Sequence, residues 1–478
     1  MTLLPTSNTG STVASPADAV HGASYRDPAG FVFTRDGALY RQVNPAGRGD
    51  YDLLMSSGLY AALAGAGELI GHEEVDAGLS PDGRAYRVIR PSRVGFISYP
   101  YEWSFSQLRD AALLTLRLQK TAMRHGMSLK DATPYNVAFD GGRPIFIDTL
   151  SFERLEPGAP WVAYRQFCES FLAPLALMSH VNICLGRLLR SELEGVPLDL
   201  ASALLPLRTR FRPGVLVHLH LHAAMQRRMS RPRPSGPPAA PRRPLTRSAV
   251  PALVDSLERT VQALRWMPAG TVWGDYYERT NYSEAAFDHK RHLVDAALER
   301  LKPATVWDLG ANDGTFSRLA SRRGILTIAF DLDPAAVEKN YREVVRTRDR
   351  HLVPLLMDLT NPSASCGWAH AERASLESRG PADLALALAL VHHLAIAHNV
   401  PLPRIAAYLA SIARALVIEF VPKHDSQVQR MLASRKDVFA AYSQDAFEAA
   451  FAERFTIREA VPVRGSERVL YTMVRRTR

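Results

Sequence analysis

The sequence predicts an α/β protein whose C-terminal half contains a doubly wound parallel sheet, preceded by an α+β half. Short apolar segments alternate with amphipathic helical segments from residue 304 onward, as in a parallel sheet with helices on both faces. A glycine-containing turn follows the first of these segments, at the position where such sheets bind ligands. The length of 478 residues exceeds one ordinary core, so two domains are expected.

Five apolar segments are predicted to form the parallel strands, and two more form a closing antiparallel hairpin. The fourth segment is apolar nearly throughout, as expected of a strand that is covered on both faces. Pro334 opens a helix in the favoured first turn, and Gly465 lies in the hairpin turn. The predicted strands are 304–309, 325–330, 352–357, 382–390, 413–420, 455–459 and 469–474, with a first helix at 315–322.

A basic, proline-rich segment divides the chain. Residues 226–247 contain seven arginines and no acidic residue, which indicates a solvated linker or contact with an anionic surface. Because the net charge of +10 depends mainly on this segment, nucleic acid is not an expected partner. We expect a disordered tail at 1–24, a first domain at 25–225 with a helical end, and a second at 248–478. Cleavage in the linker should leave two stable pieces.

Cysteine usage and hydropathy favour a cytoplasmic protein without a membrane span. The three cysteines are far apart and lack CxxC spacing, which argues against a disulfide framework or a structural zinc site. The first 24 residues lack the basic start and apolar block of a signal peptide. Segment 171–189 is too interrupted by polar residues to be a span. Nothing in the sequence assigns an oligomeric state.

The strongest motif is VWDLGANDGTFS at 306–317, where a strand ends near Asp308 and leads into a glycine-containing loop. Glycines allow the backbone to approach a ligand without an intervening Cβ. The pattern D-x-G-x-N-x-G differs from the G-x-G-x-x-G of dinucleotide-binding folds. Asp331 ends the next strand, where a carboxylate can accept two hydrogen bonds from the cis-diol of a ribose.

These segments, in this order, resemble the motifs of class I, Rossmann-like, S-adenosylmethionine-dependent methyltransferases. Four segments carry this resemblance. Segment 306–317 resembles the first motif and segment 328–334 the acidic second motif. Segment 355–362 resembles the third motif, and segment 382–394 resembles the fourth strand with its loop. The resemblance implies S-adenosylmethionine as cofactor, with Asp358 against the adenine amine. The implied cofactor-binding residues are Asp308, Gly310, Asn312, Gly314, Asp331, Asp358 and Tyr277.

Segment 273–294 precedes the first strand and is rich in tyrosine. In families of similar sequence such a segment often folds over the cofactor as a lid, and Tyr277 would then pack against the methionine or the substrate. The alternative is that Tyr276, Tyr277 and Tyr282 only anchor a helix to the core.

Methyl transfer to a hydroxyl requires alignment of the acceptor and removal of its proton. His392 and His393 follow the fourth strand, where the resemblance implies substrate-facing groups, and an imidazole is a suitable base. Two adjacent histidines cannot both point inward from a helix, so one is expected to cap or pack. Glu419, at the end of the fifth strand, either orients a histidine, holds a substrate amine or is solvated. The expected acceptor is a small molecule or glycan, with a hydroxyl ahead of an amine.

The N-terminal half contains a second pattern, in which Asp131 precedes Asn136 by five residues and Asp148 follows after an apolar strand. This spacing resembles the catalytic-loop Asp and the two metal ligands of protein kinases and aminoglycoside-type phosphotransferases. The resemblance implies an Mg-ATP site with magnesium on Asn136 and Asp148. Arg41, in a strand at 38–43, would replace the nucleotide-binding lysine.

Two further departures from the kinase pattern leave three alternatives open. No G-x-G-x-x-G precedes Arg41, and Leu129 and Lys130 stand where His-Arg or His-Gly is usual. The half is then a kinase-like module with lost or altered activity that binds a nucleotide, a working phosphotransferase in a bifunctional enzyme, or an unrelated substrate-binding domain. The whole chain resembles bacterial methyltransferases described as nodulation-related.

Overall fold

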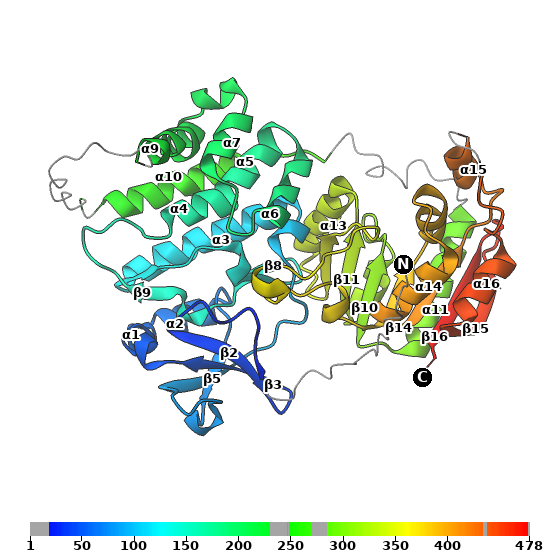
Figure 1. Cartoon of the computed structure of the whole chain (residues 1–478), viewed down its shortest axis with the longest axis horizontal. Helices are drawn as coiled ribbons and strands as arrows, with labels where there is room; N and C mark the ends of the chain where they lie inside the picture. The colour runs from blue at the N-terminus through cyan, green and yellow to red at the C-terminus, as the bar shows by residue number, and fades with distance from the viewer. Residues whose placement is uncertain (1–18, 230–245, 247, 269–283, 434–436, 477–478) are drawn as a thin grey trace, which may run out of the picture.

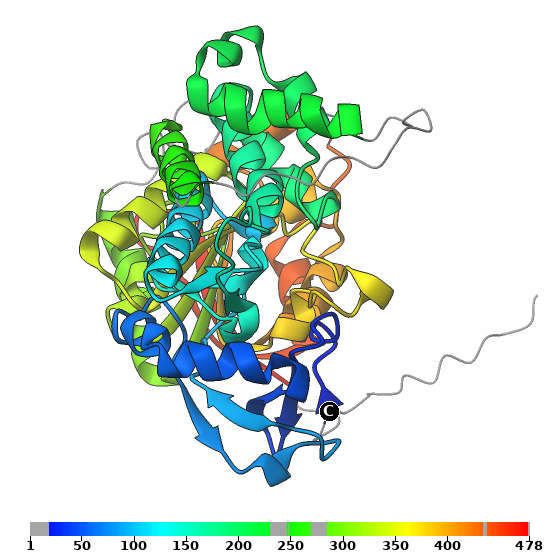
Figure 2. The ribbon, with the colours of Figure 1, turned by 90° about the vertical axis from the view of Figure 1, so that its left-hand side faces the viewer.

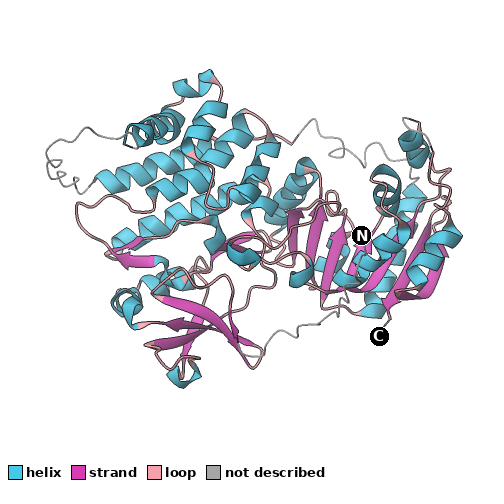
Figure 3. Cartoon of the chain, viewed as in Figure 1, coloured by secondary structure: helices cyan, strands magenta, loops and turns pink. Residues whose placement is uncertain are grey.

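The computed structural model describes residues 19–229, 246, 248–268, 284–433 and 437–476. Two lobes lie side by side, the N-terminal half on the left of Figure 1 and the C-terminal half on the right. Both contain strands and helices (Figure 3). None of the helices in these ranges has the length and apolar character needed to cross a membrane.

The C-terminal half is built on a seven-stranded sheet with the order β12-β11-β10-β13-β14-β16-β15. Strands β10 to β14 are parallel, and β16 runs antiparallel between β14 and β15. This arrangement confirms the predicted doubly wound sheet with an antiparallel terminal hairpin. The strands are β10 (Thr305–Leu309), β11 (Leu326–Asp331), β12 (Leu352–Leu356), β13 (Ala382–Ala387), β14 (Ala413–Phe420), β15 (Phe455–Pro462) and β16 (Val469–Arg475).

The strand order reverses between β10 and β13, which creates a crevice at the carboxyl ends of these strands. The chain leaves β10 towards β12 at one edge and then returns past β10 to form β13. Strand β13 ends at Ala387, three residues before the predicted end, and Ala389 adopts a positive φ of 49°. The segment after β13 therefore turns across the crevice instead of extending the sheet.

Alternate side chains of each strand face opposite sides of this sheet, as strand geometry requires. Val306 and Leu384 pack with α11 (Glu284–Leu301) and α12 (Ser317–Ser321) on one face. Trp307 and Ala385 face the other side, where α14 and α16 cover part of the sheet. The remaining helices of this half are α13 (Pro334–Thr347), α14 (Leu402–Ile412), α15 (Ser426–Leu432) and α16 (Gln444–Ala452).

The N-terminal half combines a five-stranded antiparallel sheet with helices, which confirms the α+β prediction. The sheet has the order β1-β2-β3-β5-β4, and two further strand pairs, β6 with β9 and β7 with β8, follow. The strands are β1 (Ala19–Val20), β2 (Gly30–Arg35), β3 (Ala38–Val43), β4 (His72–Val75), β5 (Arg87–Pro91), β6 (Met127–Leu129), β7 (Val137–Asp140), β8 (Arg143–Phe146) and β9 (Phe152–Arg154).

The long helix α3 (Phe105–Arg124) forms the centre of this half. Ser104 caps it, because its hydroxyl accepts a hydrogen bond from Gln107 N while the Gln107 side chain accepts one from Ser104 N. Other helices are α1 (Arg48–Ser56), α2 (Leu59–Gly65), α4 (Tyr164–Phe167), η6 (Cys168–Leu172), α5 (Ala173–His180), η7 (Ile183–Arg187), α6 (Leu188–Ser191), α7 (Leu198–Leu204), η8 (Leu207–Phe211), α8 (Pro213–Val215), η9 (Leu216–Leu221), α9 (His222–Met229) and α10 (Ala249–Ala263).

The domain boundaries differ from those predicted. Ala19 pairs with Thr34, so strand β1 lies inside the expected 1–24 tail. Helix α10, which was expected in the C-terminal domain, packs on α3, and Lys120 Nζ lies 2.6 Å from Asp255 and 2.5 Å from Glu258. Helix α9 reaches Met229, and most of the predicted linker lies outside the described residues.

The two halves share one apolar core. Phe96 of the N-terminal half packs edge-on against Trp307 and Phe330 of the sheet, with ring centroids 5.8 and 6.1 Å apart. These side chains belong to a single continuous cluster of buried residues that spans both halves. The N-terminal half therefore takes the place of a covering helix on this part of the sheet.

Buried polar contacts join the same surfaces. Glu102 forms a two-pronged ion pair with Arg379 at 2.6 and 2.8 Å, and both side chains are almost fully buried. Glu102 also accepts a hydrogen bond from the Ser363 hydroxyl at 2.6 Å. Nearby, the backbone N–H and the hydroxyl of Ser106 donate to Glu338 at 3.0 and 2.6 Å. These contacts join the halves, because Glu102 pairs with Arg379 and Glu338 accepts hydrogen bonds from Ser106 across the junction.

We predict that Glu102→Gln lowers the free energy of unfolding by about 3–5 kcal/mol, because Arg379 stays buried without its countercharge. Chemical denaturation of the full chain would measure this change, and both halves are expected to unfold in one transition. Asp295→Asn, which removes a half-exposed partner of Arg323, should leave the value close to wild type. Equal effects of the two variants, or separate transitions for the halves, would contradict the shared core.

Candidate functional site

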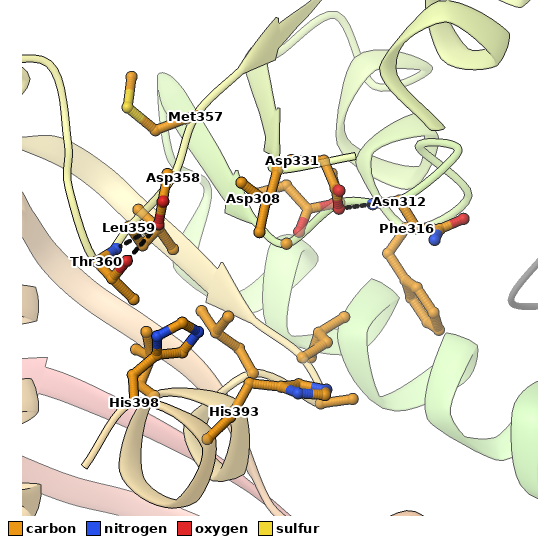
Figure 4. Close-up of a pocket in the computed structure, with 18 of the residues that line it drawn as sticks. Asp308, Asn312, Phe316, Asp331, Met357, Asp358, Leu359, Thr360, His393 and His398 are labelled. Atoms are coloured by element: carbon orange, nitrogen blue, oxygen red, sulfur yellow. Dashed lines mark hydrogen bonds between the residues drawn. The ribbon is translucent and has the colours of Figure 1, made fainter. Parts of the chain in front are cut away.

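A pocket of about 260 Å³ opens at the carboxyl ends of β10, β11, β12 and β13 (Figure 4). It lies at the crevice created by the reversal of strand order. Its wall combines three carboxylates with apolar side chains from the sheet edge and from α11. The lining residues are Phe287, Lys290, Asp308, Gly310, Ala311, Asn312, Phe316, Asp331, Leu332, Met357, Asp358, Leu359, Thr360, Leu388, Ala389, Leu390, His393, Leu394, Ala397 and His398.

The loop after β10 forms one wall, as the motif at 306–317 predicted. Gly310 has a φ of 81°, a conformation that side chains rarely adopt, and Asn312 shares the left-handed region with a φ of 50°. The amides of Gly310 and Ala311 both donate to Phe330 O at 2.9 Å. These bonds hold the loop against the end of β11.

Gly314 has a different place from the one predicted. It does not line the pocket, and a Cβ there would come within 2.3–2.5 Å of the Asn340 side chain. Its φ of 82° and this contact make Gly314 a packing requirement between the loop and α13. A glycine pattern in a sequence cannot distinguish close approach to a ligand from close approach to a neighbouring helix.

Asp331 lies where β11 ends and closes onto the same loop. Its two oxygens accept hydrogen bonds from Asn312 N at 2.7 Å and from Asp333 N at 2.8 Å, and Figure 4 shows the first of these. The carboxylate keeps acceptor capacity for a ligand hydroxyl, because a carboxylate offers about four lone-pair sites. Burial raises the pKa of Asp331 to about 6 despite these hydrogen bonds.

Asp308 lies deeper in the pocket. It accepts a hydrogen bond from the Ser317 hydroxyl at 2.6 Å. Burial raises the pKa of Asp308 to about 7, and the charge of Asp331 acts in the same direction. Two buried carboxylates that resist ionisation together make this end of the pocket favourable for a cationic or hydrogen-bond-donating ligand.

Asp358 lies just beyond β12, at the opposite end of the pocket in Figure 4. Its Oδ1 accepts hydrogen bonds from the amide and the hydroxyl of Thr360 at 2.9 and 2.6 Å. The acid-bearing turn expected after the third strand is therefore present and faces the pocket.

Glu419 is not a solvated strand end, which corrects one of the alternatives for this residue. It is fully buried, and its Oε2 accepts hydrogen bonds from Lys290 Nζ and Ala389 N, both at 2.7 Å. Arg468 lies 3.9 Å from its other oxygen. Glu419 thus holds an amine of its own chain and fixes the turn after β13.

Lys290 was missed by the sequence analysis. It lies on α11, lines the pocket and has its Nζ 4.9 Å from the centre of the Phe316 ring. Burial lowers the pKa of Lys290, whereas the charge of Glu419 raises it. No local motif marks this lysine, because its partner is 129 residues away in the sequence.

The two histidines after β13 have different surroundings, as expected for adjacent residues. His392 is buried, does not line the pocket, and has its pKa lowered well below the usual value by burial. His393 lines the pocket, and burial lowers its pKa to about 4. His393 is therefore uncharged near neutral pH, and His392 is the packing member of the pair. His398, which was not predicted, also lines the pocket.

The predicted contact of Tyr277 lies outside the described residues, as do Tyr276 and Tyr282. The described part of the proposed lid begins at α11. Phe287 and Lys290 of this helix face the pocket, so the helix forms part of its wall.

The residues of the second pattern do lie close together. Arg41 NH1 is 2.8 Å from Asp148 Oδ1. Burial raises the pKa of Asp131; the Asp148 charge adds to this rise, and a hydrogen bond with Asn136 opposes it. Asp131 also accepts a hydrogen bond from Gln166 at 2.7 Å, and Asn136 donates to the Ser151 hydroxyl at 3.2 Å.

Arg41 pairs directly with the carboxylate that was expected to bind magnesium. The Asp148 oxygen that contacts Arg41 also accepts a hydrogen bond from Leu150 N at 2.9 Å. Within the described ranges, no three His, Cys, Asp or Glu side chains are grouped so that they could hold a metal ion. The predicted residues therefore lie close together, but the Asp148 carboxylate is already paired with the Arg41 guanidinium of the same chain.

Comparisons with solved structures find only weak similarity. Magnesium protoporphyrin IX methyltransferase (ChlM) from Synechocystis PCC 6803, with bound SAH, is 18% identical, covers 43% of this chain and 93% of its own, and has a TM-score of 0.30. The N-methyltransferase NodS from Bradyrhizobium japonicum WM9 is 12% identical, with coverages of 41% and 99% and a TM-score of 0.30. The bifunctional kinase-methyltransferase WbdD is 14% identical, with 45% coverage of both chains and a TM-score of 0.29. These similarities are too weak to assign an activity.

No protein-family model matches the chain. Among curated proteins, the nodulation protein NoeA of Rhizobium meliloti (strain 1021) is 36% identical over 468 residues, with 97% of each sequence aligned. The similarity therefore includes both halves and the segment between them. At this identity and coverage, the chain belongs to the family of the nodulation protein NoeA.

Proposed function

We propose that this protein is an S-adenosylmethionine-dependent methyltransferase. The observation that carries the proposal is Asp331 at the end of β11, with its carboxylate held against the Gly310–Asn312 loop and facing the pocket. A carboxylate there suits the two hydroxyls of a ribose. The order of strands and motifs supports the same cofactor, because an acid lies near the carboxyl end of each of β10, β11 and β12.

The other pocket residues fit the remaining parts of this cofactor. Asp308 is buried beside the loop, where it would hold an amino group, and Asp358 would accept from an adenine amine. Lys290 lies on the same wall, with its ammonium held by Glu419. The apolar side chains of Phe287, Phe316 and Leu388 exclude water between these polar ends. When bound, the cofactor supplies a methyl group activated on a sulfonium.

We infer that the acceptor is a hydroxyl of a small molecule or glycan and that His393 accepts its proton. His393 follows β13 and lines the pocket beside Leu390 and Leu394. Because burial holds the pKa of this ring at about 4, the imidazole is neutral at physiological pH and has a free lone pair, but it is a weaker base than an ordinary histidine, so its effect depends on its position beside the acceptor. Glu419 does not contact the acceptor in this scheme and positions Lys290 instead.

Cofactor affinity should depend on the Asp331 carboxylate and therefore on pH. Ligand hydroxyls favour the ionised form, whose pKa is about 6 in the ligand-free protein. Affinity is thus complete above this pKa and is lost as the pH falls through it, by about tenfold at one unit below. Calorimetric titration with S-adenosylhomocysteine at pH 8 and pH 5 would test this dependence.

The Asp331→Ala variant should bind S-adenosylhomocysteine about 1–3 kcal/mol more weakly at pH 8. Its affinity should also depend less steeply on pH, and the pH dependence that remains would come from Asp308. Asp445→Ala, an exposed acid on α16, is the matched control and should titrate like the wild type. Absence of binding by the intact protein, or binding of NAD instead, would contradict the proposed cofactor.

His393→Ala is expected to reduce the methylation rate by about 10²–10⁴-fold while leaving cofactor affinity unchanged. The rate would be followed as transfer of labelled methyl from the cofactor to a product in cell extract, which also identifies the acceptor. His351→Ala, an exposed histidine at the far end of β12, should retain full activity. Full activity of His393→Ala would show that the acceptor needs no histidine base.

We further propose that the N-terminal half is a kinase-like module that does not transfer phosphate. The proposal is supported by the proximity of Asp131, Asn136 and Asp148 after the antiparallel sheet and α3. The 2.8 Å pair between Arg41 and Asp148 opposes magnesium binding, because the guanidinium already neutralises the carboxylate. A planar guanidinium is also a poor substitute for a lysine ammonium in a tight phosphate pocket.

The full chain should therefore release no labelled phosphate from γ-labelled ATP and transfer none to cell-extract acceptors, with or without magnesium. A fluorescent ATP analogue should likewise show no magnesium-dependent binding. Magnesium-dependent binding that is lost in Asp148→Asn and retained in Asp140→Asn, an exposed acid at the end of β7, would contradict the proposal. That result would favour the bifunctional enzyme or the nucleotide-regulated alternative.

A further inference from the structure

One end of the N-terminal half carries an unusual concentration of exposed apolar side chains. Eight of the eighteen large hydrophobic residues that are exposed in the described chain lie between residues 200 and 229. Phe211 is 87% exposed and Leu207 is 72% exposed, values close to those of a free side chain. We call this set the apolar helical patch, and its members are Leu200, Leu204, Leu207, Phe211, Val217, Leu221, Met225 and Met229.

The spacing of these residues places them on the outer faces of consecutive helices. Leu200 and Leu204 are four residues apart on α7, and Val217, Leu221 and Met225 follow the same step along η9 and α9. The inner faces of these helices are buried through Ala201, Leu219 and Ala223. Each helix is therefore apolar on both sides, and the outer side is not used by the fold.

The helices that carry the patch are neighbours. Helix α7 contacts both η9 and α9, and η8, which carries Leu207 and Phe211, contacts η9. Figures 1 and 2 show α7 and α9 together at the top of the molecule, away from the C-terminal sheet. Exposed apolar side chains gathered on neighbouring helices of a folded protein indicate an interaction site.

The patch is surrounded by arginines. Arg208, Arg210 and Arg212 alternate with the residues of η8 around Phe211, and Arg227 and Arg228 lie beside Met225 and Met229; all five are exposed. Asp199 is the single acidic residue between 198 and 229. Arg210, Arg212, Arg227 and Arg228 form no ion pair with any acid in the described chain.

The sequence that follows α9 contains further positive charge. Residues 230–247 contain five more arginines and no acid. This segment begins directly after Met229, a member of the patch. The apolar surface and the basic segment are thus connected through the end of one helix.

We propose that the apolar helical patch docks on the surface of an anionic lipid bilayer. The apolar side chains would enter the boundary between headgroups and acyl chains, and the surrounding arginines would contact the negatively charged headgroups. A second copy of this chain is a poorer occupant, because a self-complementary contact would bring the two sets of arginines together. The protein then lies on the membrane surface by its N-terminal half, with the pocket in the other half.

Flotation of the full-length protein with lipid vesicles tests this assignment. The protein should float with vesicles of phosphatidylcholine and phosphatidylglycerol, and much less with phosphatidylcholine alone. Raising the salt concentration should weaken the binding, because screening reduces the headgroup attraction. Failure to float with the anionic vesicles at low salt would overturn the proposal.

Two variants separate the apolar and the charged contributions. Leu207→Ser/Phe211→Ser should reduce binding to anionic vesicles at least about tenfold, because both side chains lose apolar burial. Arg210→Gln/Arg212→Gln should reduce it about 25-fold, at about fivefold for each arginine, and weaken the preference for phosphatidylglycerol. The matched control is Trp368→Ser, which removes an aromatic side chain that is 71% exposed in the other half and should leave binding unchanged.

The unfolding midpoint and the affinity for S-adenosylhomocysteine should be the same in all of these variants, which confirms that they fold. Binding of Leu207→Ser/Phe211→Ser at the wild-type level would overturn the proposal. Light scattering would measure the oligomeric state of the same proteins. A wild-type oligomer that Leu207→Ser/Phe211→Ser converts to monomers, with no flotation of either protein, would show that the patch is a contact between copies of the chain and would overturn the proposal.

Discussion

The buried contact between Glu102 and Arg379 has consequences throughout the molecule. Arg379 lies at the end of the segment that connects β12 to β13 and that begins near Asp358. Its ion pair with Glu102 anchors this segment on the N-terminal half. Ser363, within the same segment, donates to the same carboxylate. Without an anionic partner in the other half, this segment would have a buried guanidinium and no fixed path. The position of Asp358 at the pocket thus depends on a residue more than 250 positions earlier in the chain.

The shared core has a related effect on the sheet. In a doubly wound sheet both faces need a cover, and here residues near Phe96 and the start of α3 provide part of it. The pocket lies at the edge of that interface. Its residues Leu332, Met357 and Asp358 directly follow β11 and β12, and the N-terminal half covers one face of these two strands. A rigid junction would hold the proposed cofactor site in place while the N-terminal half contacts another surface. The basic, apolar end of that half is well placed for such a contact.

Much of the fold could be predicted from local patterns. The strands at 413–420 and 38–43 have the predicted bounds, and the parallel order follows from alternation of strands and helices. Loop residues Gly310, Asn312 and Asp331 also lie together as expected, because a motif that joins consecutive strands is a short-range feature. The sequence did not predict the packing role of Gly314, or that β1 and α10 belong to the N-terminal half. Each of these depends on a contact between distant segments, such as Gly314 with Asn340 or α10 with α3.

The sequence by itself determined the alternation of strands and helices, the acidic residues near the ends of β10, β11 and β12, and the spacing of Asp131, Asn136 and Asp148. These features have local spacing that survives without knowledge of the packing. Only the tertiary structure decided that Lys290 lines the pocket, that Glu419 is its partner, and that His393 rather than His392 faces the site. Only the structure showed that the apolar residues of α7, η8 and α9 face outward. The reason is that burial and ion pairing depend on which surfaces meet across the fold, and helical periodicity alone does not reveal which face of a helix is covered.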